Sequence, residues 1–591
     1  ETIDKVGEIE LGRINWIGRA AGLLWITRNT DEWFGHTTTG VLGYNETSSS
    51  WLRPIYLDIL IDQAGYYPGG PKRFILQCNE PLEGNGSFSV QSLSGDILYS
   101  GSLGPRFDRP DWDAYYWVGE FTPLQVRGNF TIEVAISGLS ARSMRFEMDN
   151  DVVLEECGEL VYKFLKYMRC GYTDSEVGWT TWLKRPRPCH MDDGILPNGT
   201  HMDATGGWHC AGLWGGKYSE YHTYVLFNIL LAYDLRPDFF GSIDRDADGL
   251  PDILNEAMWG CDFLVKMQVS NGSIFHEVEK VEVTDGIVGT VDGRKIRGWV
   301  PLHNGLLAVA GLAGTASLIH DSYPQESERY LSAALRSFAR YREGITTSVQ
   351  AASMVLACAQ LYRATSNRSY LDLAEYWCNR TLDMPYSEYY GPFVPCALGW
   401  YLEMNQNSSL RERVKDYICR LADSRIRGDT SPENPQLPFE IPTWSLYIQD
   451  PWAAEVLFAY RVTGNLTYLR HGMTMVDYHL GVNPYSICFL EGAGTINPPS
   501  YASHFRSGPN PRAAVPGSIP YRGLYLLFGK PHYEEGETWL INTNFIQAIS
   551  LIPKDTGQYP LEVSEGAFGV LAAGVLAGLL LFSRVPTTRA S

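Results

Sequence analysis

One segment of the chain spaces its carboxylates as calcium-binding loops do. Asp244, Asp246 and Asp248 alternate with other residues, a glycine follows at once, and Asp252 comes four positions later. Oxygen ligands at alternate positions, with a glycine for the sharp turn, are what a loop-type calcium site requires. The twelfth position of such a loop holds Asn255 instead of the usual glutamate. The segment therefore predicts a calcium site or, alternatively, the plain solvated start of a helix.

Aromatic residues are the second group with a chemical use. The chain has 17 Trp, 35 Tyr and 23 Phe among its 591 residues, and aromatic rings stack well on the apolar faces of sugars. Large helical cores also contain many aromatics, so their abundance alone does not distinguish the two roles. The formal net charge of −19 repels phosphate backbones, and we therefore expect no nucleic-acid partner.

Glycosylation signals indicate the compartment in which the chain works. Nine N-x-S/T sequons begin at Asn45, Asn85, Asn129, Asn198, Asn271, Asn367, Asn379, Asn407 and Asn465. A sequon marks an acceptor position on the surface of a secreted protein. The 11 cysteines are widely spread and form no dense disulfide pattern. The sequence therefore predicts an extracellular glycoprotein.

A possible membrane anchor lies near the C-terminus. Residues 566–583 form an uncharged apolar run that is long enough to span a bilayer as a helix. Glu562 and Glu565 precede this run, and Arg584 and Arg589 follow it. This distribution predicts a transmembrane helix with the short tail inside and the bulk of the protein at the cell surface. A buried core helix is the alternative interpretation.

Hydrophobic periodicity then indicates the elements that must position these residues. Residues 1–52 show no clear period, and we interpret them as an N-terminal extension or linker. Over residues 53–150, short alternating segments separated by turn residues predict a β-sandwich. Over residues 151–555, apolar residues recur at helical spacing and predict one large all-α domain. Paired helices of this kind can close a barrel whose loops line a cleft.

Segments spread along the chain resemble glycoside hydrolase family 9, a family of cellulases. They are Ile61–Pro68 (IDQAGYYP), His201–His209 (HMDATGGWH), Asp248–Trp259 (DGLPDILNEAMW), Leu480–Pro484 (LGVNP) and Ser503–Arg506 (SHFR). The resemblance implies a small N-terminal immunoglobulin-like β-sandwich, then an (α/α)6 barrel, and an ancestry in the inverting hydrolysis of β-1,4-glucans.

The catalytic carboxylates of the family are matched by other residue types. Inverting hydrolysis needs one carboxylate that activates water and one carboxylic acid that protonates the leaving oxygen. By resemblance, Cys210 and Leu213 stand where the aspartates of the base loop belong, and Thr538 stands at the position of the acid. With a shift of one residue in the comparison, Glu537 would be the acid. The sequence therefore predicts a degenerate catalytic site.

The resemblance also implies a metal site. Cys170, Cys189, His190 and His209 match a zinc site of family members that have this N-terminal module. Two thiolates and two imidazoles suit a closed, tetrahedral, structural zinc. A Cys170–Cys189 disulfide is the alternative, since the chain is expected outside the cell.

The last group of residues implied by the resemblance would contact a sugar. His504 and Arg506 match the sugar-contacting histidine and arginine of the family. Trp208, Trp214 and Trp444 are the candidates for stacking on pyranose rings. For any single Trp, packing in the core is the competing role.

Together these features predict a cell-surface protein with a cellulase-like scaffold, in effect a pseudoenzyme. It would bind a β-1,4-glucan-type polysaccharide or serve as a surface component. The alternative is an active, inverting β-glycoside hydrolase with relocated catalytic residues, among them Glu537 as the acid.

Overall fold

The computed structural model describes most of the chain up to residue 553, and Glu1–Pro553 form one compact unit. The described residues are 14–20, 23–29, 39–45, 50–51, 55–110, 112, 114–171, 188–191, 193–210, 216–279, 294–386, 393–405, 408–427, 438–439, 446–497, 516–520, 522–527, 530–534 and 543–553. In residues 14–51, 446–451 and 522–534 the backbone alone is described. The predictions that lie outside the described residues concern Leu213, Trp214, Trp444, His504, Arg506, Glu537, Thr538 and residues 566–583.

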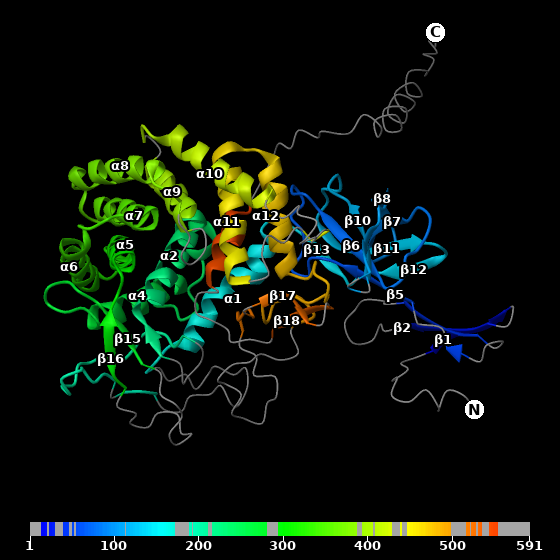
Figure 1. Cartoon of the computed structure of the whole chain (residues 1–591), viewed down its shortest axis with the longest axis horizontal. Helices are drawn as coiled ribbons and strands as arrows, with labels where there is room; N and C mark the ends of the chain where they lie inside the picture. Colours follow the sequence, from blue (N-terminus) through cyan, green and yellow to red (C-terminus); the bar gives the residue numbers. More distant parts are fainter. Residues whose placement is uncertain are drawn as a thin grey trace, which may run out of the picture. The chain divides into compact units, whose positions relative to one another are not determined.

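Two antiparallel sheets form the N-terminal β-sandwich (Figure 1). The first sheet contains β1 (Ile14–Ala20), β2 (Leu23–Asn29), β3 (Thr39–Asn45), β4 (Ser50–Trp51), β5 (Ile55–Leu60), β6 (Arg73–Cys78), β9 (Phe107–Arg109) and β10 (Ala114–Glu120). Its order is β1-β2-β3-β5-β6-β10-β9, with β4 beside β3. The second sheet contains β7 (Ser87–Ser92), β8 (Ile97–Ser102), β11 (Gly128–Ile136), β12 (Leu139–Arg142) and β13 (Phe146–Met148). Its order is β12-β11-β7-β8, with β13 beside β11.

Period-two patterning explains how the sheets enclose a core. Along β11, Phe130, Ile132, Val134 and Ile136 are buried, and the residues between them are more exposed. Alternate side chains of a strand point to opposite faces, so this pattern turns one face inward. The inward residues pack with those of the other sheet around Phe74. The predicted sandwich is therefore present.

The described strands of residues 14–51 differ from the predicted linker. The first four strands extend the sandwich sheet, because β3 pairs with β5 through Val41↔Ile55 and Thr39↔Leu57. The lack of a clear hydrophobic period over residues 1–52 predicts an extension or linker instead. Ladder hydrogen bonds use backbone groups, however, so a partner strand can hold residues of low strand propensity in the sheet.

The helical domain follows the sandwich. Its helices are α1 (Val152–Met168), α2 (Ser219–Leu235), α3 (Pro237–Phe240), α4 (Asp252–Lys266), α5 (Leu302–Ile319), α6 (Pro324–Tyr341), α7 (Ser348–Thr365), α8 (Arg368–Asp383), α9 (Phe393–Met404), α10 (Arg411–Arg427), α11 (Leu446–Thr463), α12 (Leu466–His479) and α13 (Phe545–Leu551). Among the described helices, α2, α5, α7, α9, α11 and α13 pack in this order into a closed inner ring. The outer helices α1, α4, α6, α8, α10 and α12 cover that ring. This arrangement is an (α/α)6 barrel.

Residue types distinguish the two rings. The inner helix α5 is apolar all round and almost wholly buried, and its glycines allow close packing, since a Cβ on Gly311 would lie 2.8 Å from Leu226. The outer helix α6 is buried along one stripe, as expected of a helix with one face in water. Among the described helices, α5 is the one apolar and long enough to cross a membrane, and it is packed inside the barrel.

Several connections run from an outer helix to the next inner helix. The described parts of two of them meet at one end of the barrel, where their strands pair (Figure 1). Two of these connections, residues 169–218 and 267–301, contain β14 (Lys217–Tyr218), β15 (Phe275–Val278) and β16 (Ile296–Trp299). The antiparallel β17 (Arg522–Leu527) and β18 (Lys530–Glu534) belong to another of them. We call this the loop end of the barrel.

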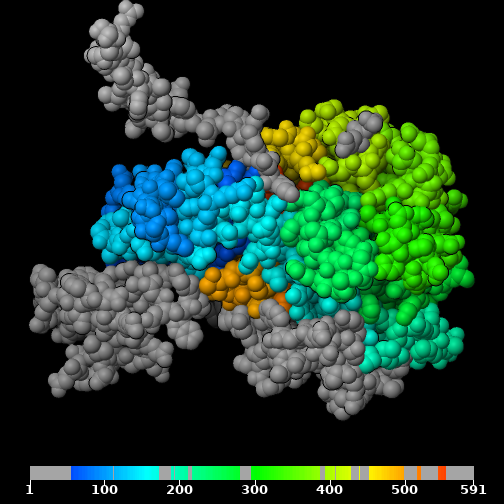
Figure 2. Space-filling model, turned by 180° about the vertical axis from the view of Figure 1, so that it is seen from behind, coloured from blue at the N-terminus to red at the C-terminus, as the bar shows by residue number. Residues whose placement is uncertain are grey.

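The sandwich is joined to the barrel by buried polar contacts. The backbone N–H of Gln63 donates to the carbonyl of Leu480 (2.8 Å), and its side chain donates to the carbonyl of Ser486 (2.9 Å). Asp62 lies beside Asp477 of α12, and both side chains are buried. In the space-filling view the described atoms of the sandwich, in blue, meet the helical domain directly (Figure 2).

Candidate metal centre and substrate site

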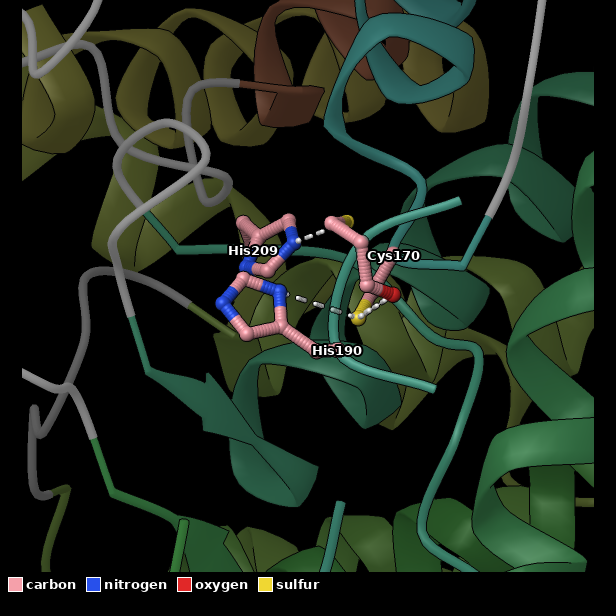
Figure 3. Close-up of side chains that lie close together, drawn as sticks. Cys170, His190 and His209 are labelled. Carbon is pink, nitrogen blue, oxygen red and sulfur yellow. Dashed lines mark hydrogen bonds between the residues drawn. The ribbon is translucent and has the colours of Figure 1, made fainter. Parts of the chain in front are cut away.

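The four side chains predicted to bind metal come together at the loop end. Cys170 follows α1, Cys189 and His190 come from the next described segment, and His209 precedes β14. Their ligand atoms all lie within 4.8 Å of one another, and all four residues are buried. Cys170 Sγ is 3.8 Å from His190 Nδ1, and Cys189 Sγ is 3.4 Å from His209 Nε2 (Figure 3).

The backbone holds two of these ligands in place. His190 has φ of 53°, a left-handed conformation that is costly for a residue with a Cβ and is found where surrounding structure imposes it. The N–H of His209 donates to the carbonyl of Met168 at the end of α1 (2.8 Å). Burial lowers the pKa of His209 to about 4, so its imidazole is neutral at pH 7, with a lone pair available to a metal.

A charged cluster surrounds the sulfur of Cys170. Lys217 Nζ lies 3.4 Å and Arg294 Nη2 3.8 Å from this sulfur. Both cations also contact Asp193, Lys217 at 2.7 Å and Arg294 Nε at 2.7 Å. Burial alone would raise the pKa of Asp193, but the two cations outweigh it and lower this pKa to about 2.

The chemistry of this donor set fits zinc. Cys170 and Cys189 form no disulfide, and their side chains are buried together with the two imidazoles. Cysteine sulfur and imidazole nitrogen are the ligands that structural zinc sites use. The arrangement has the composition of a structural site with four protein ligands rather than that of a catalytic site with an open position. Zinc itself stays a prediction.

The segment in which the resemblance predicts a substituted catalytic base begins at this metal centre. Cys210 directly follows the ligand His209, and its N–H donates to the carbonyl of Gly216 (3.0 Å). This hydrogen bond holds the two ends of the segment 210–216 together, next to Lys217. Cys210 is only 8% exposed. The structure therefore places this thiol largely inside the protein, and Leu213 lies outside the described residues.

Trp208 does not have the predicted sugar-stacking role. Its side chain is 0% exposed, its indole Nε1 donates to Glu256 (3.1 Å), and its ring stacks on His222 with centroids 5.0 Å apart. A ring enclosed in this way has no free face for a pyranose. The prediction for Trp208 was wrong because a resemblance in sequence does not show which side chains the fold covers.

One carboxylate at the loop end, for which the sequence favours a solvated helix face, is buried in the structure. Glu220, in the first turn of α2, is buried, and its Oε1 is 3.3 Å from His276 Nε2. This hydrogen bond raises the pKa of His276. His303, at the start of α5, is also buried, and burial lowers its pKa to about 4. The pairing of β14 with β15 brings His276 to Glu220, and no local signal in the sequence indicates that contact.

The predicted calcium loop is assembled only in part. Carboxylate oxygens of Asp244, Asp246 and Asp252 lie within 4.8 Å of one another. The carboxylate of Asp248 accepts instead from the N–H of Leu250 (2.8 Å) and the side chain of Asn255 (3.1 Å). Burial and then the negative charge of Asp246 raise the pKa of Asp252. Three facing carboxylates suit a hard cation, but exposed acidic groups at a helix start also occur without one.

The comparisons with known proteins agree with this architecture. Residues 156–529 match Glycosyl hydrolase family 9, and residues 57–138 match the cellulase N-terminal ig-like domain. A cellodextrinase from Butyrivibrio fibrisolvens is 25% identical over 405 residues, covering 62% of this chain and 70% of the relative. A xyloglucan-specific endo-beta-1,4-glucanase from Bacteroides ovatus is 22% identical, covering 74% of this chain and 81% of the relative. The structure of a metagenome-derived family 9 endoglucanase aligns with a TM-score of 0.68 at 19% identity, covering 84% of this chain and 98% of that chain.

Proposed function

Because the chain belongs to glycosyl hydrolase family 9, we propose that it binds β-1,4-linked glucans at the loop end of its barrel and hydrolyses them little or not at all. The family resemblance and the order of immunoglobulin-like domain and helical domain expected from the sequence are confirmed. Relatives named as glucanases and a cellodextrinase support a glucan as the ligand.

The proposal of weak hydrolysis rests on the residue type and the burial of Cys210. By resemblance this residue occupies a position at which the family uses a carboxylate. Cys210 has a thiol and is only 8% exposed. Its backbone N–H donates to the carbonyl of Gly216. Acid or base assistance is worth about 10²–10⁴ in rate, so a chain without its catalytic base should turn over slowly. The substitutions at Leu213 and Thr538 remain part of the prediction.

Zinc would serve a structural role in this proposal. When bound to Cys170, Cys189, His190 and His209, it would link segments that are far apart in the sequence. Lys217 and Arg294 hold the sulfur of Cys170 from one side, and Asp193 fixes both cations. His209 and Lys217 flank residues 210–216, so the same cluster anchors both ends of that segment.

We also propose a cell-surface glycoprotein, anchored by residues 566–583. The sequon positions support glycosylation because the asparagines at Asn85, Asn198, Asn271, Asn367 and Asn465 are exposed. Mass spectrometry of the chain purified from a eukaryotic host, before and after enzymatic deglycosylation, tests the glycosylation. Deglycosylation should lower the mass of peptides that contain these positions, and a chain that reaches the cell surface unmodified would contradict the proposal.

An active inverting hydrolase is the alternative function. The observation that favours it is Glu220, a buried carboxylate next to His276 at the loop end. If Glu220 activates water, a second carboxyl group such as Glu537 must protonate the leaving oxygen. In that case Glu220→Gln abolishes turnover, whereas under our proposal it changes nothing measurable in hydrolysis.

Reducing-end release and binding, measured side by side on soluble β-1,4-glucans, test the proposal. We expect the purified full-length chain to bind without releasing ends. The variant Cys210→Asp, Leu213→Asp, Thr538→Glu restores the family's carboxylates and should gain turnover. Efficient turnover by the natural chain would contradict degeneracy, and the Glu220→Gln variant then tests the alternative base. Absence of any glucan binding would contradict the proposed ligand.

A further inference from the structure

An exposed tryptophan lies flat on the β15–β16 hairpin. Trp299 is directly opposite Phe275 in the antiparallel register. The two rings are stacked with centroids 4.3 Å apart and planes 16° apart. Phe275 is 9% exposed and Trp299 is 54% exposed. One face of the indole is therefore covered by Phe275, and the other face is open to solvent.

Another equally exposed aromatic, Tyr376, has a different geometry. Tyr376 on α8 is also 54% exposed, but it meets Trp377 edge to face, with planes 82° apart. An isolated exposed aromatic is ordinary on a protein surface. A ring fixed parallel to the surface by a stacked partner is different, because its free face is flat and already ordered, as a stacking ligand requires.

Charged side chains lie along the same face of the hairpin. In a strand, residues two apart point to the same side about 7 Å apart, so Lys295 and Arg297 share the face of Trp299. Arg297 is opposite Glu277 in the register, and its guanidinium is 2.5 Å from Glu279. The face thus offers an apolar ring followed by hydrogen-bonding groups. A β-linked pyranose has matching parts, since its C–H face is apolar and its hydroxyl groups lie around the ring edge.

The hairpin borders the proposed binding site. β14 pairs with β15 through Tyr218↔Glu277 and directly follows residues 210–216, and Trp299 lies three residues before α5 at the loop end. From this placement we propose that Trp299, backed by Phe275 and flanked by Arg297, is an additional sugar-stacking subsite for β-1,4-linked pyranose chains. The inference rests on the proposed function and extends it to a named surface.

Binding of cellohexaose to the full chain tests the subsite by isothermal titration. Trp299→Ala should raise Kd roughly three- to tenfold, and Trp299→Phe, which keeps a ring, should raise it less. Tyr376→Ala, which removes an equally exposed aromatic, should leave Kd unchanged. Hydroxyl-radical footprinting of the unaltered chain provides a readout that does not depend on the variants folding, and cellohexaose should protect Trp299 but not Tyr376.

The outcomes separate this subsite from the function it rests on. If the unaltered chain binds no cellohexaose, the proposed function and the subsite both fail. If it binds, but Trp299→Ala binds equally well and Trp299 is not protected, the subsite alone is overturned. A loss of self-association in Trp299→Ala with unchanged glucan affinity would also overturn it, because the ring would then contact a second copy of the chain.

Discussion

The buried acidic pair between the sandwich and the barrel makes the stability of the protein depend on pH. Asp62 accepts hydrogen bonds from the N–H groups of Ala64 (2.8 Å) and Gly65 (3.2 Å) through Oδ1. No donor among the described residues reaches its Oδ2. Burial and then the charge of Asp477 raise the pKa of Asp62 well above its usual value. Two carboxyl groups in contact keep a proton between them because both cannot ionise at low cost.

Replacing Asp477 by Asn removes one titrating group and keeps its shape. Burial raises the pKa of Asp477 from 3.8 to about 7, although the positive charge of Arg73 and a hydrogen bond from Asp62 act against this. The folded state therefore holds an extra proton between these pH values. Stability from this group is fully present below pH 3.8 and is lost as pH rises to about 7. About three pH units at about 1.4 kcal/mol per unit correspond to a loss of about 4 kcal/mol.

The assay is thermal and chemical unfolding of the unaltered chain and Asp477→Asn from pH 4 to pH 8. Near pH 4 the two should be about equally stable, because Asn resembles the protonated acid. Toward pH 7 the variant should become more stable by up to about 4 kcal/mol, with little further change above that. Tyr66 and Cys157 also face Asp62, but the pKa of each is raised, so neither thiol nor phenol ionises in this range.

A surface substitution provides the matched control. Asp372→Asn on α8 removes a carboxylate that is 67% exposed and pairs with Arg368, one turn earlier in the helix. Its effect should stay within about 0.5 kcal/mol at every pH. A stability difference between Asp477→Asn and the unaltered chain that does not change with pH would refute the shared-proton reasoning. Greater stability of the unaltered chain at pH 8 would refute it as well.

Three further predictions concern the metal centre and its surroundings. Arg294→Met leaves buried Asp193 with one cation fewer and should lower the free energy of unfolding in urea by about 3–5 kcal/mol. The control Arg297→Met, at a side chain 58% exposed, should lower it by less than about 0.5 kcal/mol. Equal effects of the two substitutions would contradict the stabilising role of the buried pair. Gly207→Ala should lower the melting temperature, because Gly207 has φ of +72° and the added Cβ would lie 2.6 Å from Phe263. An unchanged melting temperature would contradict this and show that the turn relaxes. Strong chelation at pH 7 should release zinc, measured by atomic emission, and lower the melting temperature; a chain purified from zinc-containing medium that has no bound metal would contradict the zinc proposal.

Local patterns were enough to predict the general architecture. The alternation in residues such as Phe130 and Ile132 follows from the geometry of a strand and predicts its buried face without knowledge of its partner. Helix α7 also starts in a local motif, because the Gln350 N–H donates to the Thr347 hydroxyl and the Gln350 side chain accepts from the Thr347 N–H. Family resemblance depends on short motifs, and these survive at low identity because each meets a local backbone or ligand requirement.

The site required more than local pattern. The sequence supplied the chemical types of Cys170 and His209 and their likeness to a known ligand set, and these depend only on which residues are present. Tertiary structure alone decided that Trp208 is enclosed, that Glu220 meets His276, and that Trp299 lies open on Phe275. Burial and pairing depend on neighbours from distant parts of the chain, in these cases some 50 residues away for Trp208 and for Glu220. The exposure of a side chain is therefore a property of the folded molecule. The same is true of its pKa and of the ring face that is available to a ligand.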